Sequence, residues 1–221
     1  MKVKQKLIAG AIALSAMAGF AVPAAHAEVS AAVGAANMYY WRGFDLGAGD
    51  PQVWGDLKVS GAGFYGGTWV SSGDAVLGQE IDLYAGYGTE LAGFTFDLSF
   101  WSYVYPSAVP EIDAGESSEG VLAVGYGPVT ATYIKNVASE YGDNSYSYAS
   151  LALVLDKFTL KYGVHSQDDQ SDASLDGVQH VDLSYAFNDM LSFTLGQVID
   201  DGVAEVNDEA KVIVGFTFPI E

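Results

Sequence analysis

The stretch 94–100 reads Phe-Thr-Phe-Asp-Leu-Ser-Phe, with an apolar residue at every second position. Side chains of a β-strand point alternately to its two faces, so this pattern predicts a strand with one apolar and one polar face. The same period of two recurs at 147–155, 157–164, 180–187 and 210–218. No helical period of 3.6 is found after the N-terminal region. We therefore expect an all-β protein.

The alternating segments number about twelve and fill one domain. They lie near 30–42, 52–60, 63–71, 80–88, 93–104, 119–126, 129–138, 145–155, 157–165, 178–187, 190–198 and 210–218. The two segments 119–126 and 129–138 have the weaker pattern, and ten strands is the alternative if one of them is misassigned.

The connections between these segments alternate in length. Those after even-numbered segments are short, whereas those after odd-numbered segments are longer and acidic. The longer connections are 43–51, 72–79, 105–118, 139–144, 166–177 and 199–209, and they hold 17 of the 28 Asp and Glu residues. Outer-membrane barrels combine short periplasmic turns with long extracellular loops in this way. The sequence thus predicts a transmembrane, antiparallel, up-and-down β-barrel in the bacterial outer membrane.

The first 27 residues have the pattern of a cleaved signal peptide. Lys2, Lys4 and Lys6 precede an apolar run, and Ala25-His26-Ala27 provides the small-x-small site that signal peptidase requires. A retained N-terminal membrane helix is the alternative. We expect residues 1–27 to be the signal and residues 28–221 to form the barrel.

Charge and composition exclude several classes of function. The signal removes three of the nine Lys and Arg residues, which leaves six against 28 acids, a formal charge of −22. So few basic residues predict no nucleic-acid partner. The chain has no cysteine, which excludes disulfides and thiolate metal ligands. We expect no cofactor.

Charged residues on the polar faces of the strands are the candidate pore lining. A Lys or Arg facing lipid at mid-bilayer costs about 2–4 kcal/mol, so we assign these residues to the lumen. They are Arg42 at the end of the first strand, Asp56, Lys58, Glu80, Asp82, Asp97, Lys161, His180, Asp182 and Lys211. They could line an open pore or form ion pairs that fill the lumen. Twelve strands enclose room for a modest channel, and the excess of acids would favour cations.

Aromatic residues gather toward the ends of the predicted strands. The set comprises Tyr39, Tyr40, Trp41, Trp69, Trp101, Tyr103, Tyr105, Tyr126, Tyr141 and Tyr146. Amphipathic rings favour the interface between lipid headgroups and hydrocarbon. Packing inside the lumen is the alternative, and the sequence pattern does not separate the two.

Several motifs follow one another in the first half of the mature chain. Residues 37–43 read Asn-Met-Tyr-Tyr-Trp-Arg-Gly, and 60–69 read Ser-Gly-Ala-Gly-Phe-Tyr-Gly-Gly-Thr-Trp. Residues 80–87 read Glu-Ile-Asp-Leu-Tyr-Ala-Gly-Tyr, and 103–106 read Tyr-Val-Tyr-Pro. In this order they resemble the TorF family of proposed porins, also called the Gcw_chp group. The Ser-Asp-Tyr that often precedes the family's Arg-Gly is absent here. The resemblance implies an outer-membrane barrel with a pore role, but no defined substrate.

Metal binding and catalysis are the less favoured interpretations. The loop 168–177 is rich in Asp, but its spacing is not that of an EF-hand, so a solvated acidic loop is the better interpretation. The same holds for the acids of 200–209. His165 with Ser166 lacks an orienting third group and a Gly-x-Ser-x-Gly motif, so we expect no enzyme.

The sequence as a whole favours a channel for passive diffusion of small polar or cationic solutes. A structural or adhesive barrel with a closed, ion-paired lumen is the alternative. Expected partners are outer-membrane lipid, the solutes and the barrel assembly machinery. That machinery reads a terminal aromatic residue, and here the last one, Phe218, stands three residues before the end of the sequence.

Overall fold

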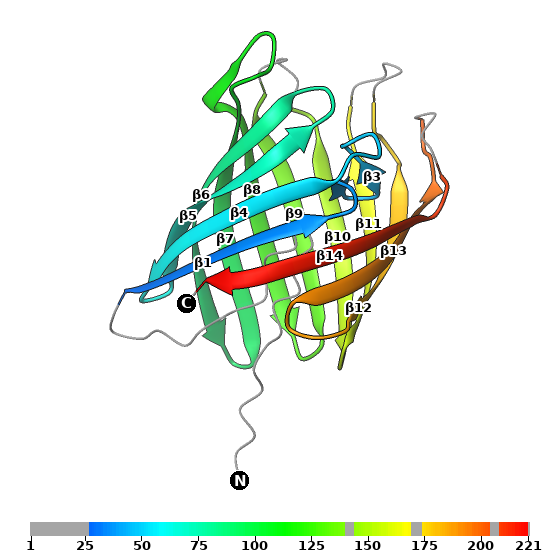
Figure 1. Cartoon of the computed structure of the whole chain (residues 1–221). Coiled ribbons are helices and arrows are strands. Elements are labelled where there is room, and N and C mark those ends of the chain that lie inside the picture. Colours follow the sequence, from blue (N-terminus) through cyan, green and yellow to red (C-terminus); the bar gives the residue numbers. More distant parts are fainter. Residues whose placement is uncertain (1–26, 140–143, 169–173, 204–207, 221) are drawn as a thin grey trace.

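The computed structural model describes residues 27–139, 144–168, 174–203 and 208–220, and the predicted signal apart from Ala27 lies outside them. Twelve strands form one closed barrel (Figure 1). They are β1 (Glu28–Ala36), β4 (Gln52–Gly61), β5 (Phe64–Asp74), β6 (Gly78–Leu91), β7 (Phe94–Tyr105), β8 (Ile112–Tyr126), β9 (Val129–Ala138), β10 (Ser147–Leu155), β11 (Phe158–Ser166), β12 (Gln179–Ala186), β13 (Leu191–Asp200) and β14 (Lys211–Ile220). The two weaker segments are strands, so twelve is confirmed over ten.

Every neighbouring pair in the barrel is antiparallel, and the strands follow one another in chain order. The first and last strands close the wall, with Ala31 paired to Ile220 and Ala36 to Gly215. Closure gives each strand a partner on both sides. Backbone N–H and C=O groups then have hydrogen-bond partners within the wall. The wall must supply these partners because lipid hydrocarbon has no hydrogen-bonding groups.

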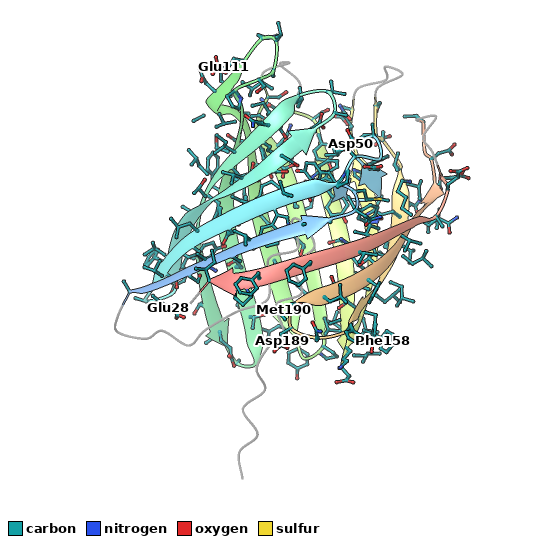
Figure 2. The ribbon with its side chains drawn as sticks, in the orientation of Figure 1. Glu28, Asp50, Glu111, Phe158, Asp189 and Met190 are labelled. Carbon is teal, nitrogen blue, oxygen red and sulfur yellow. The ribbon has the colours of Figure 1, made fainter. Side chains whose placement is uncertain are left out.

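Tight two-residue turns join several strands at one end of the barrel, which we call the turn end. Ala62-Gly63 and Ala92-Gly93 each connect antiparallel neighbours, and all four residues have positive φ, between 53° and 86°. Such turns match the right-handed twist of the strands that they join. Figure 2 shows Glu28, Phe158 and Asp189 at this end, whereas Asp50 and Glu111 lie at the opposite loop end.

The outer face of the wall is apolar. Leu98 on β7 is 63% exposed and Leu151 on β10 is 52% exposed, whereas the intervening residues of these strands point inward. Aromatic pairs stand near the turn end, including Phe64–Tyr87 and Phe94–Tyr126, each with ring centroids 4.7 Å apart. A closed barrel with an apolar exterior and an aromatic belt is an outer-membrane protein. The predicted fold and location are confirmed.

The described residues include no helix with the length and hydropathy needed to cross a membrane.

The first strand was predicted to run over 30–42, and this is wrong. β1 ends at Ala36, and Asn37 then caps it, donating to the carbonyl of Val212 (2.9 Å) and accepting from the amide of Val214 (2.7 Å). The chain turns away from the wall into a two-stranded hairpin, β2 (Tyr40–Trp41) and β3 (Phe44–Asp45). Its tip residues, Arg42 and Gly43, have φ of 46° and 101°, which a continuous strand does not adopt. Residues 43–51 are therefore not a simple outer loop.

Three other boundaries also differ from the prediction. β8 begins at Ile112, so much of the predicted loop 105–118 is strand. β5 extends to Asp74 and β6 begins at Gly78, so the predicted loop 72–79 is shortened to a tight connection. The wall is thus taller over β5–β8, where extended backbone continues through polar residues that lack the alternating apolar pattern.

We expect a charge on the outer face to destabilise the barrel according to depth. Leu98→Arg, inside the apolar band, should lower the free energy of unfolding by about 2–4 kcal/mol, whereas Leu91→Arg at the turn end should cost about 0–1 kcal/mol. Denaturant unfolding in lipid vesicles, followed by tryptophan fluorescence, measures both. Equal costs would contradict the membrane placement.

Candidate functional site: the luminal hairpin and its wall

Nine of the ten residues predicted to line the lumen stand on barrel strands at inward-facing positions. They are Asp56, Lys58, Glu80, Asp82, Asp97, Lys161, His180, Asp182 and Lys211, and none is in the exposed class. The tenth, Arg42, was placed at the end of the first strand. It lies instead at the tip of the β2–β3 hairpin, inside the barrel, and is 6% exposed. We call residues 39–46 the luminal hairpin.

Arg42 forms a buried ion pair with Glu119 on β8. Its two terminal nitrogens donate to the two carboxylate oxygens, over 2.9 and 2.6 Å. Arg42 also donates to the Tyr146 hydroxyl (2.9 Å), and Tyr103 donates to Glu119 (2.6 Å). A two-pronged pair of this kind fixes both distance and orientation. It therefore ties the hairpin tip to the β8 side of the wall.

Two adjacent tyrosines tie the base of the hairpin to opposite sides of the wall. Tyr39 donates to Glu80 on β6, and Tyr40 donates to Asp182 on β12, each over 2.5 Å. β6 and β12 are six strands apart in both directions around a barrel of twelve. The luminal hairpin therefore reaches across the lumen from wall to wall, toward the loop end, where Figure 1 shows β3.

The hairpin tyrosines act as hydrogen-bond donors. Burial, followed by the charge of Asp182, raises the pKa of Tyr40 above its ordinary value. Burial, followed by the charge of Glu80, does the same for the pKa of Tyr39. A neutral phenol beside a carboxylate can only donate to it, which agrees with the two bonds.

His165 on β11 holds the hairpin tip by its backbone. Its Nε2 lies 2.9 Å from the carbonyl oxygen of Arg42, which can only accept, so Nε2 carries a proton. Its Nδ1 lies 3.0 Å from the Tyr146 hydroxyl. Tyr146 can donate to Nδ1 while it accepts from Arg42, so a neutral His165 satisfies the whole chain of bonds.

Asp182, like Glu119, is a carboxylate that contacts several side chains at once. Besides Tyr40, it contacts Lys161 on β11 (3.0 Å) and His180 Nδ1 on its own strand (3.0 Å). Tyr148 on β10 lies 2.8 Å from the other nitrogen of His180. Three strands thus converge on the place where Tyr40 reaches the wall.

Gly196 on β13 provides the space that Tyr40 occupies. A Cβ atom at this position would overlap with the Tyr40 hydroxyl. Gly43 at the hairpin tip packs against His180 in the same way, since a Cβ there would lie 3.0 Å from that of His180. Close approach between wall and hairpin therefore requires glycine at both positions.

Most of the aromatic residues that were predicted near strand ends pack inside the lumen. Tyr39, Trp69 and Tyr84 form one buried cluster, and Tyr84 stacks on Trp101 with centroids 4.4 Å apart. Tyr126 belongs to the outer belt, and Tyr141 lies outside the described residues. Luminal packing is thus the main role of this set, and other residues form the belt.

The half of the lumen toward the turn end differs in character. Inward positions there carry hydroxyl groups, among them Thr95, Thr130, Thr132, Ser150, Thr159, Ser184, Ser192 and Thr194. Asp56 accepts from Tyr84 (2.8 Å), Asp97 accepts from Tyr65 (2.8 Å), and Lys58 lies over the Tyr65 ring. This half therefore presents small polar groups to the interior.

Glu119 is the residue of this site that the sequence prediction left out, and Tyr39 and Tyr40 were predicted only as members of the aromatic set. On β8 the inward positions after Glu119 are Val121 and Ala123, which are buried and apolar. Both faces of β8 are therefore apolar beyond Glu119. The strand lacks the alternation that identified the other luminal charges, so its inward face could not be recognised from sequence. The Tyr-Tyr-Trp-Arg-Gly run was visible, but the pattern did not reveal its inward fold.

His165 points inward, whereas Ser166 is exposed and donates to Asp176 (3.2 Å), so the two do not form a nucleophile–base pair. No group of three or more His, Cys, Asp or Glu placed to hold a metal ion occurs among the described residues. Parts of the acidic loops 168–177 and 200–209 lie outside those residues.

We expect the Arg42–Glu119 pair to show the energetics of a buried ion pair. Arg42→Met or Glu119→Met alone should cost about 3–5 kcal/mol, because each leaves one buried charge unpaired, and the double variant should cost less than either. Denaturant unfolding measures the three variants, with the exposed Lys157→Met as control. Single variants no less stable than the control would contradict a dry, buried pair.

Residues 20–206 match the model of the family described as "Bacterial protein of unknown function (Gcw_chp)". No curated protein matches the chain.

Among solved structures, the KdgM porin in complex with disordered oligogalacturonate is similar at 10% identity and a TM-score of 0.48, over 88% of this chain and 100% of that one. Outer membrane phospholipase A from Escherichia coli is similar at 10% identity and 0.45, over 87% and 90%. A mutant of the Rh. blastica porin is similar at 11% identity and 0.33, over 88% and 100%. The family match spans most of the sequence, and the chain therefore belongs to the Gcw_chp family of bacterial proteins.

Proposed function

We propose that this barrel is an outer-membrane channel through which small polar or cationic solutes diffuse passively. The observation that carries the proposal is the many polar side chains of the inner face, the hydroxyl groups at the turn end and the charged hairpin network toward the loop end. A twelve-stranded barrel is wider than the eight-stranded barrels that side chains fill. A lumen serving only as a packed core would favour apolar residues, because buried polar groups are costly.

Charge favours cations as the permeating solutes. The six segments that the sequence predicts as longer connections hold 17 acids and no Lys or Arg, and the structure folds parts of them into strands or into the lumen. Inside the barrel, six carboxylates, including Glu119, stand against four Lys and Arg side chains. A mouth with only negative charge concentrates cations and repels anions.

The luminal hairpin is proposed as the constriction of this channel. It is attached to β6, β8, β11 and β12 by side-chain hydrogen bonds, so it narrows the lumen at one level. Its position sets the size of solute that passes. In this proposal the TorF-like motif at 37–43 has a physical role, as the segment that forms the constriction.

The polar inner face serves permeation in this proposal, and we assign no catalytic role to the chain. The remaining partners are the lipid around the apolar band and the assembly machinery that inserts the barrel. A second candidate function is a structural barrel with a closed lumen. The wall-to-wall reach of the luminal hairpin favours it, because the same bonds that narrow the lumen could seal it.

Reconstitution in planar bilayers tests the proposal. We expect discrete single-channel steps from the full mature chain, and a reversal potential in a KCl gradient that reports preference for K⁺ over Cl⁻. The reason is the excess of acids at the mouth and on the inner wall. Anion preference would contradict the charge argument, and silence of correctly folded barrels would favour the structural function.

A variant that displaces the hairpin separates a constriction from a seal. In Gly196→Val the new side chain takes the space of the Tyr40 hydroxyl, so we expect larger conductance than in the native barrel. Gly120→Val is the matched control, because a Cβ at Gly120 meets only Val137 at an ordinary 3.7 Å. Unchanged conductance in Gly196→Val would contradict the role of the hairpin, and conductance that appears only in this variant would indicate a sealed native lumen.

A further inference from the structure

Asp82 on β6 is a buried acid with no hydrogen-bond or ion-pair partner in the described structure. Its side chain is 0% exposed, and neither carboxylate oxygen has a hydrogen-bond partner among the described residues. Burying a charge in this way is costly unless it is paired or binds a metal ion. The other inward acids have donors, so Asp82 is the exception that requires an explanation.

The hydroxyl groups around Asp82 already donate elsewhere. Tyr103 on β7 is the Cα partner of Asp82, and Tyr39 and Tyr105 both reach the neighbouring Glu80. Tyr39 and Tyr105 donate to Glu80, which stands two residues away on the same face of β6, and Tyr103 donates to the Glu119 carboxylate. A phenol that donates its proton still has lone pairs on oxygen. These three phenols therefore have no proton left to donate to Asp82.

No basic side chain compensates Glu80 or Asp82. Six Lys and Arg residues follow the predicted signal, and none forms an ion pair with either acid in the described structure. Their contacts are Arg42 with Glu119, Lys161 with Asp182, Lys58 with the Tyr65 ring, and Lys135, Lys157 and Lys211 with the backbone carbonyls of Ser145, Phe187 and Glu209. The segments 140–143, 169–173 and 204–207 contain no Lys, Arg or His. No basic side chain of the described structure thus faces this adjacent pair of acids.

We propose that Glu80 and Asp82 form a luminal site for a hard divalent cation of the Ca²⁺ or Mg²⁺ class. Two carboxylates match the double charge of the ion, and the phenol oxygens of Tyr39, Tyr103 and Tyr105 supply further hard ligands. Such ions take oxygen ligands, and Mg²⁺ commonly binds through only one or two carboxylates with water completing the shell.

The site adjoins the constriction, because Tyr39 of the luminal hairpin donates to Glu80. A cation bound there would also neutralise the wall that the hairpin contacts. A role for this site in cation permeation rests on the proposed channel function. Cation binding by the site does not depend on that function. An equilibrium measurement on the barrel in detergent therefore separates the two: silent bilayers would leave the binding result unaffected.

Terbium luminescence tests the site directly. Trp69 on β5 is the Cα partner of Asp82, so its indole stands beside the proposed ligand and can sensitise Tb³⁺. We expect tryptophan-excited Tb³⁺ emission from the folded mature barrel at pH 7, displaced by Ca²⁺ or Mg²⁺ and not by equal ionic strength of Na⁺. Asp82→Asn, which keeps the side-chain shape, should weaken Tb³⁺ binding at least about tenfold.

Asp97→Asn is the matched control, because Asp97 is also a buried inward Asp but accepts a bifurcated hydrogen bond from the Tyr65 hydroxyl. It should retain the emission of the native barrel. Heat-modifiable gel migration verifies that each variant is folded, and Glu80→Gln provides a second loss variant should Asp82→Asn fail to fold. Absent emission in the folded native barrel, or equal emission in the loss and control variants, would overturn the proposal.

Discussion

Hydrocarbon offers no hydrogen-bond partner to a peptide group, and this constraint shapes the whole molecule. Twelve antiparallel strands satisfy it by closing on themselves, with β1 paired to β14. Closure assigns one face of every strand to lipid and the other to the interior. The outer face must then be apolar across the hydrocarbon, and most charged residues of the wall point inward.

The luminal hairpin supplies many of those partners. Its Arg42 neutralises Glu119, and its two tyrosines donate to Glu80 and Asp182. A segment that leaves the wall after Ala36 thus satisfies acids on opposite sides of the barrel. The hairpin and the charged wall stabilise each other, since removal of either would leave buried charges without compensation.

Much of the wall could be predicted from local pattern. Alternation identified all twelve strands, and it identified nine inward charged positions on them, because side-chain direction in a strand depends only on position along the chain. Alternation does not predict side-chain direction where the chain leaves the strand or where both faces are apolar. Residues 37–42 looked like more strand, yet a left-handed turn at Arg42 and Gly43 reverses the chain, and Glu119 was hidden by apolar neighbours on its own face.

The sequence by itself determined a closed outer-membrane barrel, which end carries the acidic loops and which side chains face inward. These properties follow from short-range periodicity and from the cost of polar groups in lipid. Only the tertiary structure decided what fills the lumen. The contacts Arg42–Glu119 and Tyr40–Asp182 join residues 77 and 142 positions apart, and no local pattern encodes such pairings. They arise because barrel closure brings distant strands around the same interior.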